Sequence, residues 1–154
     1  MNRIQFSDLK MPITSNQNVM NGIQALVARN GYILDNEVEH FEKSFASYCE
    51  STHSVGVATG CDALLWAMEA LGIGKGDEVI TVANTFIGTV LPIVRVGATP
   101  VLVDCDPITQ QIDPEQVAAA ITPRTSAIVP VHLSGRLAPM DELLAIADKN
   151  NLFL

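Results

Sequence analysis

Two patterns of apolar and polar residues alternate along the chain. In the first, apolar residues recur at every third or fourth position, which places them on one face of a helix. This spacing predicts helices over residues 18–30, 36–50, 63–71, 84–96, 114–121 and 140–148. In the second, short apolar runs rich in Val and Ile predict buried strands. The runs cover residues 54–59, 78–82, 101–104 and 126–131, and a further strand is expected to start at Leu152.

The order of these segments indicates the fold class. Short strands that alternate with amphipathic helices predict an α/β fold, in which helices cover both faces of a mainly parallel sheet. Ligands of such sheets bind beyond the carboxyl ends of the strands. We therefore expect the chemistry of the protein in the residues that directly follow Ala58, Val82, Asp104 and Val131.

Composition excludes several classes of protein. The chain has 154 residues, of which 48% are hydrophobic and 17% charged, and this makes it too apolar to be intrinsically disordered. Every apolar run is interrupted well before the ~20 residues that a transmembrane helix needs. Residues 1–10 lack the apolar stretch of a signal peptide. The length by itself predicts one compact domain.

Charge and cysteine content restrict the partners and the location of the protein. The 17 Asp and Glu residues outnumber the 9 Lys and Arg residues, which gives a formal net charge of −8. The chain has no basic stripe of the kind that binds nucleic acid. Cys49, Cys61 and Cys105 are widely spaced and form no C-x-x-C motif. Unpaired cysteines without a signal peptide favour a reducing, cytoplasmic location, and we expect no nucleic-acid or membrane partner.

A candidate phosphate site follows the first predicted strand. There, Thr59-Gly60-Cys61 leads directly into a helix. The start of a helix offers free N–H groups and the positive end of the helix dipole, which together bind phosphate, and a glycine lets an anion approach the backbone closely. The alternative is purely structural, because Thr59 followed three residues later by Asp62 is close to a capping box.

Other residues at the expected strand ends also allow two interpretations. Phe86 either offers its ring to an aromatic ligand or packs in the core. His132 either acts as a general acid or base, or orients a ligand, or is a hydrogen-bonded structural residue. Asp104 and Asp106 favour a capped turn over a metal site, because neither a His nor a further acid cluster lies near them in the sequence. No metal site is predicted.

Several of these segments, in this order, resemble the DegT/DnrJ/StrS family of sugar aminotransferases, which depend on pyridoxal 5′-phosphate (PLP). The resemblance extends from about Ile4 to Leu154. Its segments are Asn30-Gly-Tyr-Ile-Leu34, Glu37-Val-Glu-His-Phe-Glu42, Phe45-Ala-Ser-Tyr48, Val57-Ala-Thr-Gly-Cys-Asp-Ala-Leu64, Gly76-Asp-Glu-Val-Ile80, Asn84-Thr-Phe-Ile87, Gly97-Ala-Thr-Pro-Val101, Ile121-Thr-Pro-Arg124, and Pro130-Val-His-Leu133 with Gly135-Arg136.

The resemblance implies a fold and a domain organisation. The implied fold is the three-layer α/β/α large domain of a PLP-transferase of fold type I, like that of aspartate aminotransferase, in incomplete form. Residues 1–17 are expected to be an irregular N-terminal segment. Residues 18–154 are expected to be the N-terminal part of the PLP-binding large domain, truncated before its C-terminal part.

The resemblance also implies roles for single residues. The family's Ser-Gly-Thr segment, which holds the cofactor phosphate, matches Thr59-Gly60-Cys61, and its aromatic residue stacked on the pyridine ring matches Phe86. Asn84 and His132 are candidate substrate contacts. Cys61 stands where the family usually has Thr, and because a thiol is a weaker donor than a hydroxyl, weaker phosphate binding is expected. Asp35 stands in the place of a usual Gly, which is expected to change the local turn.

The implied reaction is the transfer of an amino group from an amino acid, usually glutamate, to a keto group of a nucleotide-linked sugar. The protein positions PLP, whose pyridine ring acts as the electron sink, and family members are usually homodimers. The family's Schiff-base Lys and the carboxylate that pairs with the pyridine nitrogen match no residue of this chain. Lys10, Lys43, Lys75 and Lys149 are all expected to be solvated. The chain is therefore expected to be an N-terminal fragment that is inactive alone.

Two alternative functions stay open at this point. Some relatives in the family replace the Lys with His and carry out a PLP-dependent sugar dehydration. A non-catalytic remnant or interaction module is the other alternative, because family members are usually homodimers with active sites at the subunit interface, and a fragment could pair with such a partner. The unfinished sheet is also expected to leave an apolar edge that is prone to association.

Overall fold

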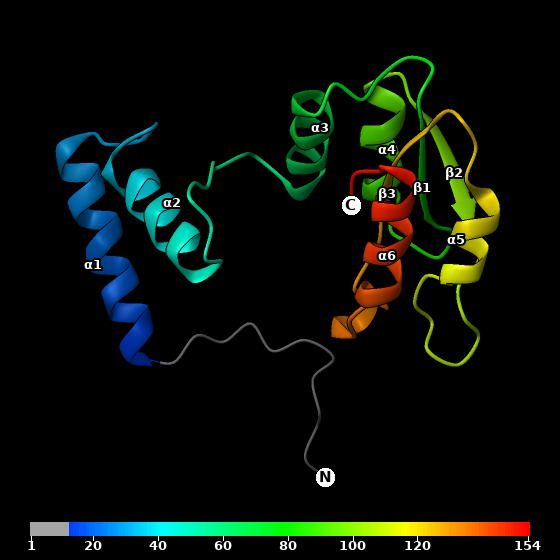
Figure 1. The fold of residues 1–154 in the computed structure, drawn as a ribbon. Coiled ribbons are helices and arrows are strands. Elements are labelled where there is room, and N and C mark those ends of the chain that lie inside the picture. Colours follow the sequence, from blue (N-terminus) through cyan, green and yellow to red (C-terminus); the bar gives the residue numbers. More distant parts are fainter. Residues whose placement is uncertain (1–12) are drawn as a thin grey trace, which may run out of the picture. The chain divides into compact units, whose positions relative to one another are not determined.

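The computed structural model describes residues 13–154, and the chain divides into two compact units between Gly56 and Val57. In the first unit two helices are described, α1 (Ile13–Arg29) and α2 (Asn36–Tyr48) (Figure 1). Helix α1 begins at Ile13, so the expectation of an irregular segment was wrong for residues 13–17. These residues are mostly polar and carry no apolar periodicity, so the sequence pattern did not reveal their helix. Residues 1–12, with Lys10, lie outside the described part.

Asp35, which stands where the family usually has Gly, has a defined local role in the first unit. Asp35 is the N-cap residue of α2, and the Arg29 Nε donates a hydrogen bond to its Oδ2 at 2.9 Å. The Arg29 guanidinium also pairs with Glu37 in the first turn of α2. Asp35 has a φ of −96°, whereas the preceding Leu34 has a left-handed φ of 50°. The aspartate thus joins the end of α1 to the start of α2 without backbone strain at its own position.

The second unit is built around a parallel sheet. Its three strands, β1 (Glu78–Val82), β2 (Thr99–Val103) and β3 (Thr125–Val129), are ordered β2-β1-β3. The register pairs Ile80 with Val101 on one side and with Ile128 on the other. The helices are α3 (Gly60–Ala70), α4 (Ile87–Arg95), α5 (Pro114–Ala120) and α6 (Met140–Asn150), with a short 3-10 turn, η1, at Leu133–Gly135.

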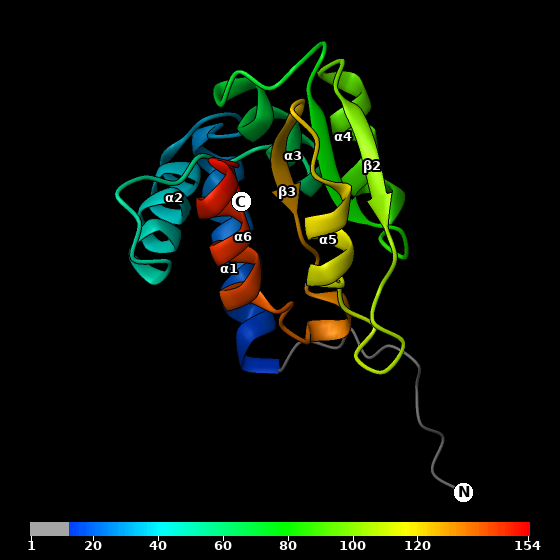
Figure 2. The same ribbon diagram turned by 45° about the vertical axis from the view of Figure 1, so that its right-hand side comes forward.

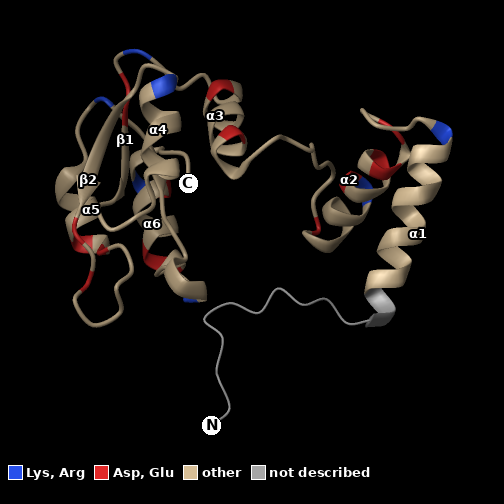
Figure 3. Ribbon diagram, turned by 180° about the vertical axis from the view of Figure 1, so that it is seen from behind, with Lys and Arg blue, Asp and Glu red and all other residues tan. Residues whose placement is uncertain are grey.

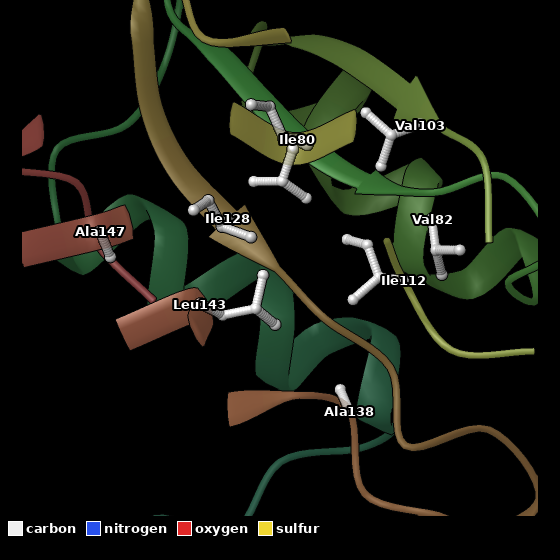
Figure 4. Packing of buried hydrophobic residues seen from close by; sticks show 9 residues of the cluster. Ile80, Val82, Val103, Ile112, Ile128, Ala138, Leu143 and Ala147 are labelled. Atoms are coloured by element: carbon white, nitrogen blue, oxygen red, sulfur yellow. The ribbon is translucent and has the colours of Figure 1, made fainter. Parts of the chain in front are cut away.

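Helices cover both faces of the sheet, as the sequence predicts. Ile80 of β1 packs with Val117 of α5 and Leu143 of α6 on one face. Val79, its neighbour, packs with Met68 of α3 and Ile93 of α4 on the other. Figure 2 shows these two helix pairs on opposite sides of the strands. Figure 4 shows the α5–α6 side, where the side chains of both helices and the strands converge. Residues of β1 are therefore buried from both sides, and the α/β/α layering is confirmed.

The strand expected at residues 54–59 is absent. These residues form no strand, and Val55 is 77% exposed. A β-prone run becomes a strand only when another strand supplies its hydrogen bonds, and none of the described residues pairs with this segment. The start of a last strand is confirmed, because the Phe153 N–H donates to Ser126 O at 3.0 Å and the Ile128 N–H donates to Phe153 O at 2.9 Å.

Positive charge is spread thinly over the described surface. Lys and Arg residues lie singly on separate elements (Figure 3), so residues 13–154 present no basic patch. No helix within that range combines the length and the apolar character needed to cross a bilayer.

Candidate functional site

The candidate phosphate-binding residues and the candidate ring-stacking residue line one hollow of the second unit. The hollow measures about 520 Å³ and lies between the start of α3 and the start of α4. Because β1 leads into the α4 start, this wall of the hollow lies at the carboxyl end of the central strand. Its lining residues are Thr59, Gly60, Cys61, Leu64, Phe86, Gly88 and Thr89.

Thr59 caps helix α3. Its backbone is extended, with φ −149° and ψ 164°, and its Oγ1 accepts a hydrogen bond from the Asp62 N–H at 3.1 Å. The same hydroxyl donates to the Asp62 carboxylate at 2.8 Å. The capping interpretation is therefore confirmed, and the side chain of Thr59 already has partners for its proton and for one lone pair.

The backbone at the start of α3 remains open to a ligand. Among residues 13–154, no acceptor binds the N–H groups of Gly60 and Cys61, as is usual in the first turn of a helix. A Cβ placed on Gly60 would meet no atom within 4 Å. Free donors, the positive end of the helix dipole and unfilled space together fit a phosphate group. The capping role of Thr59 leaves all three of these in place.

Phe86 does not pack in the core, so that interpretation was wrong. The residue is the N-cap of α4, and its side chain is 78% exposed. Its ring lies against Gly88, where a Cβ would come within 2.8 Å of the ring. A hydrogen bond of 2.8 Å between the hydroxyls of Thr85 and Thr89 braces the same turn. The ring thus lies in the wall of the hollow and is mostly exposed, and an exposed ring is available to stack on an aromatic ligand.

The two candidate substrate contacts do not line this hollow. Asn84 follows β1, and its Nδ2 donates to the Gln110 carbonyl oxygen at 3.1 Å. His132 follows β3 and is exposed, and its Nδ1 accepts a hydrogen bond from the Ala138 N–H at 3.1 Å. Each side chain therefore has a structural partner, while Asn84 Oδ1 and His132 Nε2 have no hydrogen-bond partner among residues 13–154.

The acidic pair after β2 forms a turn, as the sequence favours. Asp106 Oδ1 accepts hydrogen bonds from the N–H groups of Ile108 at 3.1 Å and Thr109 at 2.6 Å. These bonds, that of Thr109 first, hold the pKa of the Asp106 carboxyl below its usual range. Asp104 accepts a hydrogen bond from the Cys105 N–H at 2.8 Å. Within the described part of the chain, no three His, Cys, Asp or Glu side chains are close enough to hold a metal ion.

Sequence reasoning missed two residues near the strand ends. Gly88 leaves room for the Phe86 ring, but a glycine inside a helical pattern gives no such signal. Gln111 is buried, with 3% of its surface exposed, and binds the backbone of Leu133. The sequence gives one sign of this role, which is the position of Gln111. It is a polar residue directly before Ile112, and the capped helix start at Asp113-Pro114 follows.

Comparison with known proteins decides the family. The model of the DegT/DnrJ/EryC1/StrS aminotransferase family matches residues 14–154. The chain belongs to this family. The resemblance noted in the sequence is thereby confirmed, and so is the fold class it implied.

Individual relatives match nearly the whole chain but only part of their own length. The chain is 44% identical to the dTDP-3-amino-3,4,6-trideoxy-alpha-D-glucose transaminase of Streptomyces venezuelae, over 99% of this chain and 40% of that protein. It is 52% identical to the erythromycin biosynthesis sensory transduction protein EryC1 of Saccharopolyspora erythraea, over 80% and 34%. The crystal structure of NtdA from Bacillus subtilis with bound cofactor PMP superimposes with a TM-score of 0.88 at 32% identity, over 92% and 33%.

Proposed function

We propose that this chain supplies the phosphate-binding and ring-stacking part of a PLP-dependent sugar aminotransferase. The reaction would transfer an amino group from an amino acid, glutamate in our proposal, to a nucleotide-linked keto sugar. The observation that carries the proposal is that Thr59-Gly60-Cys61 and Phe86, which come from separate segments, line one hollow. Membership of an aminotransferase family and the transaminase named among the relatives support it.

In this proposal the start of α3 binds the cofactor phosphate. The N–H groups of Gly60 and Cys61 donate to phosphate oxygens, and the helix dipole adds a favourable field. The Cys61 thiol contributes little, because it is a weak donor, and so the backbone carries most of the binding. Thr59 acts mainly by fixing the first turn through Asp62.

Phe86 would bind the other end of the cofactor. Its exposed ring, held by the turn at Gly88, would stack on the pyridine ring and restrict it to one plane. When bound, PLP supplies the electron sink for amino transfer. The residues of this chain orient it from two sides, while Asn84 Oδ1 and His132 Nε2 are proposed to contact the sugar.

The remaining parts of the proposal concern organisation. Residues 18–154 would form the N-terminal part of the PLP-binding large domain, preceded by residues 1–17. A homodimer is supported by apolar side chains that are exposed on α2, among them Phe41 and Phe45. A cytoplasmic location is supported by Cys49, Cys61 and Cys105, none of which is in a disulfide.

A ligand comparison tests the proposal. Trp66 is the sole tryptophan of the chain and lies on α3, so its fluorescence reports on ligands at that helix. We expect PLP to bind more tightly than pyridoxal, which has the same ring without the phosphate. Equal affinities for the two compounds would exclude the phosphate site.

Borohydride reduction in the presence of PLP provides a second readout. Lys43, Lys75 and Lys149 lie outside the lining of the hollow, so we expect no single lysine to be labelled stoichiometrically. Stoichiometric labelling of one lysine would show that the chain carries its own Schiff-base residue and would contradict this part of the proposal.

A further inference from the structure

The loop between β2 and α5 binds the turn that follows β3 through one buried side chain. Gln111 Oε1 accepts a hydrogen bond from the Leu133 N–H at 3.2 Å, and Gln111 Nε2 donates to the Leu133 carbonyl oxygen at 3.2 Å. The side-chain amide therefore satisfies both backbone groups of one residue, as a neighbouring strand would. A buried amide that loses such partners is costly, so these bonds fix the turn relative to the loop.

The loop itself is held in shape from several directions. The Asp106 carboxylate and carbonyl accept N–H groups from within the loop, including that of Gln110 at 2.8 Å to the carbonyl. Gln110 has a left-handed φ of 61°, and its carbonyl oxygen accepts the Asn84 amide. The loop thus touches the residues after β1 and the residues after β3 at the same edge of the sheet.

The turn after β3 presents His132 in one defined state. Ser134 and Gly135 both have left-handed backbones, with φ of 55° and 78°. This bend brings the Ala138 N–H, which belongs to a buried residue, to 3.1 Å from His132 Nδ1. A nitrogen that accepts a hydrogen bond carries no proton, so the neutral imidazole has its proton on Nε2.

We propose that Gln111 is a positioning residue that acts through Leu133 to hold His132 in the tautomer with Nε2–H, at the carboxyl edge of the sheet. The exposed Nε2–H then serves as a hydrogen-bond donor to an oxygen atom of the sugar substrate. This use of the donor rests on the proposed function, whereas the positioning itself is a property of the chain without ligands.

Nitrogen-15 NMR of the imidazole tests the positioning. In the unmodified chain at alkaline pH, His132 Nδ1 should give the shift of an unprotonated nitrogen and Nε2 that of a protonated one. Gln111→Met removes both hydrogen bonds to Leu133 at similar volume, and we expect the two shifts to move toward an average of both tautomers. The matched control is Gln110→Met, which should leave both shifts unchanged. Within the described part of the chain, the side chain of Gln110 bonds only to Pro107 O in the same loop.

An unchanged Nε2–H tautomer in Gln111→Met would overturn the proposal, as would equal changes in both variants. A purely structural role would lower stability without moving the tautomer shifts, so the two roles are separable. Both variants are measured without a cofactor. The tautomer result for His132 therefore stands even if the proposed function is wrong.

If Gln111→Met does not fold, amide exchange of the unmodified chain tests whether Gln111 binds the backbone of Leu133. Leu133 lies in a turn among exposed residues, yet the proposal makes its N–H a donor to a buried acceptor. We expect the Leu133 amide to exchange about tenfold or more slowly than the same amide in an unstructured peptide. Exchange at the rate of an unstructured peptide would show that the hydrogen bonds between Gln111 and Leu133 do not exist.

Discussion

Replacement of Gly60 by alanine should change stability and ligand binding in opposite directions. Gly60 is the first residue of α3, and a Cβ built there meets no atom within 4 Å. Alanine loses less backbone entropy than glycine on helix formation, by roughly 0.5–1 kcal/mol in a helix interior. At the first position we expect the lower end of that range, which corresponds to a rise in Tm of about 2–4 °C.

The same methyl group should weaken phosphate binding, because it fills the space through which an anion reaches the N–H groups of Gly60 and Cys61. A hydrogen bond to a charged group contributes about 1.5–3 kcal/mol. Loss of one such bond corresponds to roughly ten- to a hundredfold weaker binding of PLP. Trp66 fluorescence titration measures the affinity, and circular dichroism melting measures Tm.

Gly22 provides a matched control for this substitution. It lies inside α1 of the other unit, and a Cβ there also meets no atom within 4 Å. Gly22→Ala should favour its helix in the same way and leave PLP affinity unchanged. If Gly60→Ala binds PLP as tightly as the unmodified chain, or if it melts at a lower temperature, the start of α3 is not an open phosphate site.

Three other changes have defined outcomes. Phe86→Leu should weaken PLP binding about two- to tenfold, which is the equivalent of a stacking contact of ~0.5–1.5 kcal/mol. Tm should change little, because the ring is exposed, and a large loss of Tm would place the ring in the core. Leu143→Ala should lower the free energy of unfolding by about 2–5 kcal/mol in urea titrations, since Leu143 is fully buried, and a loss below 1 kcal/mol would disprove tight packing there. Hydrogen bonds from the Ser126 hydroxyl to Asp77 and from the Thr122 hydroxyl to Glu78 lower the pKa of both carboxyls. The unfolded chain therefore binds more protons, so their contribution is present above the ordinary carboxyl pKa of about 4 and is lost as the pH falls below it; Ser126→Ala should flatten this acid dependence, and an unchanged slope would argue against the Asp77 bond.

Apolar periodicity is sufficient to predict an element whose two faces are both buried by neighbours in the same unit. The sequence pattern predicts a strand over residues 78–82. These residues form the central strand β1, because residues packed on both sides support them. Residues 54–59 have a similar composition but form no strand. The two segments differ in whether a neighbouring strand is present to pair with them. That depends on residues far away in the sequence, which a local pattern does not include.

The same limit applies to the site. The Thr59–Asp62 spacing contained enough local information to predict the cap, because a capping interaction involves residues of one turn. The exposure of Phe86 depends on Gly88 and on the course of α4 after β1, and the residue type alone favoured burial. The contact of Gln111 with Leu133 joins residues 22 positions apart, and no spacing rule reaches that far.

The proposed function depends on the start of α3 as the site that binds the phosphate of PLP. The most direct measurement follows the backbone amide signals of Gly60 and Cys61 by NMR during titration with PLP, with inorganic phosphate and with pyridoxal. We expect PLP and inorganic phosphate to shift both signals, because their oxygens accept these two N–H groups, and we expect pyridoxal to leave both signals nearly unchanged. Unchanged Gly60 and Cys61 signals at saturating PLP would contradict the proposed phosphate site.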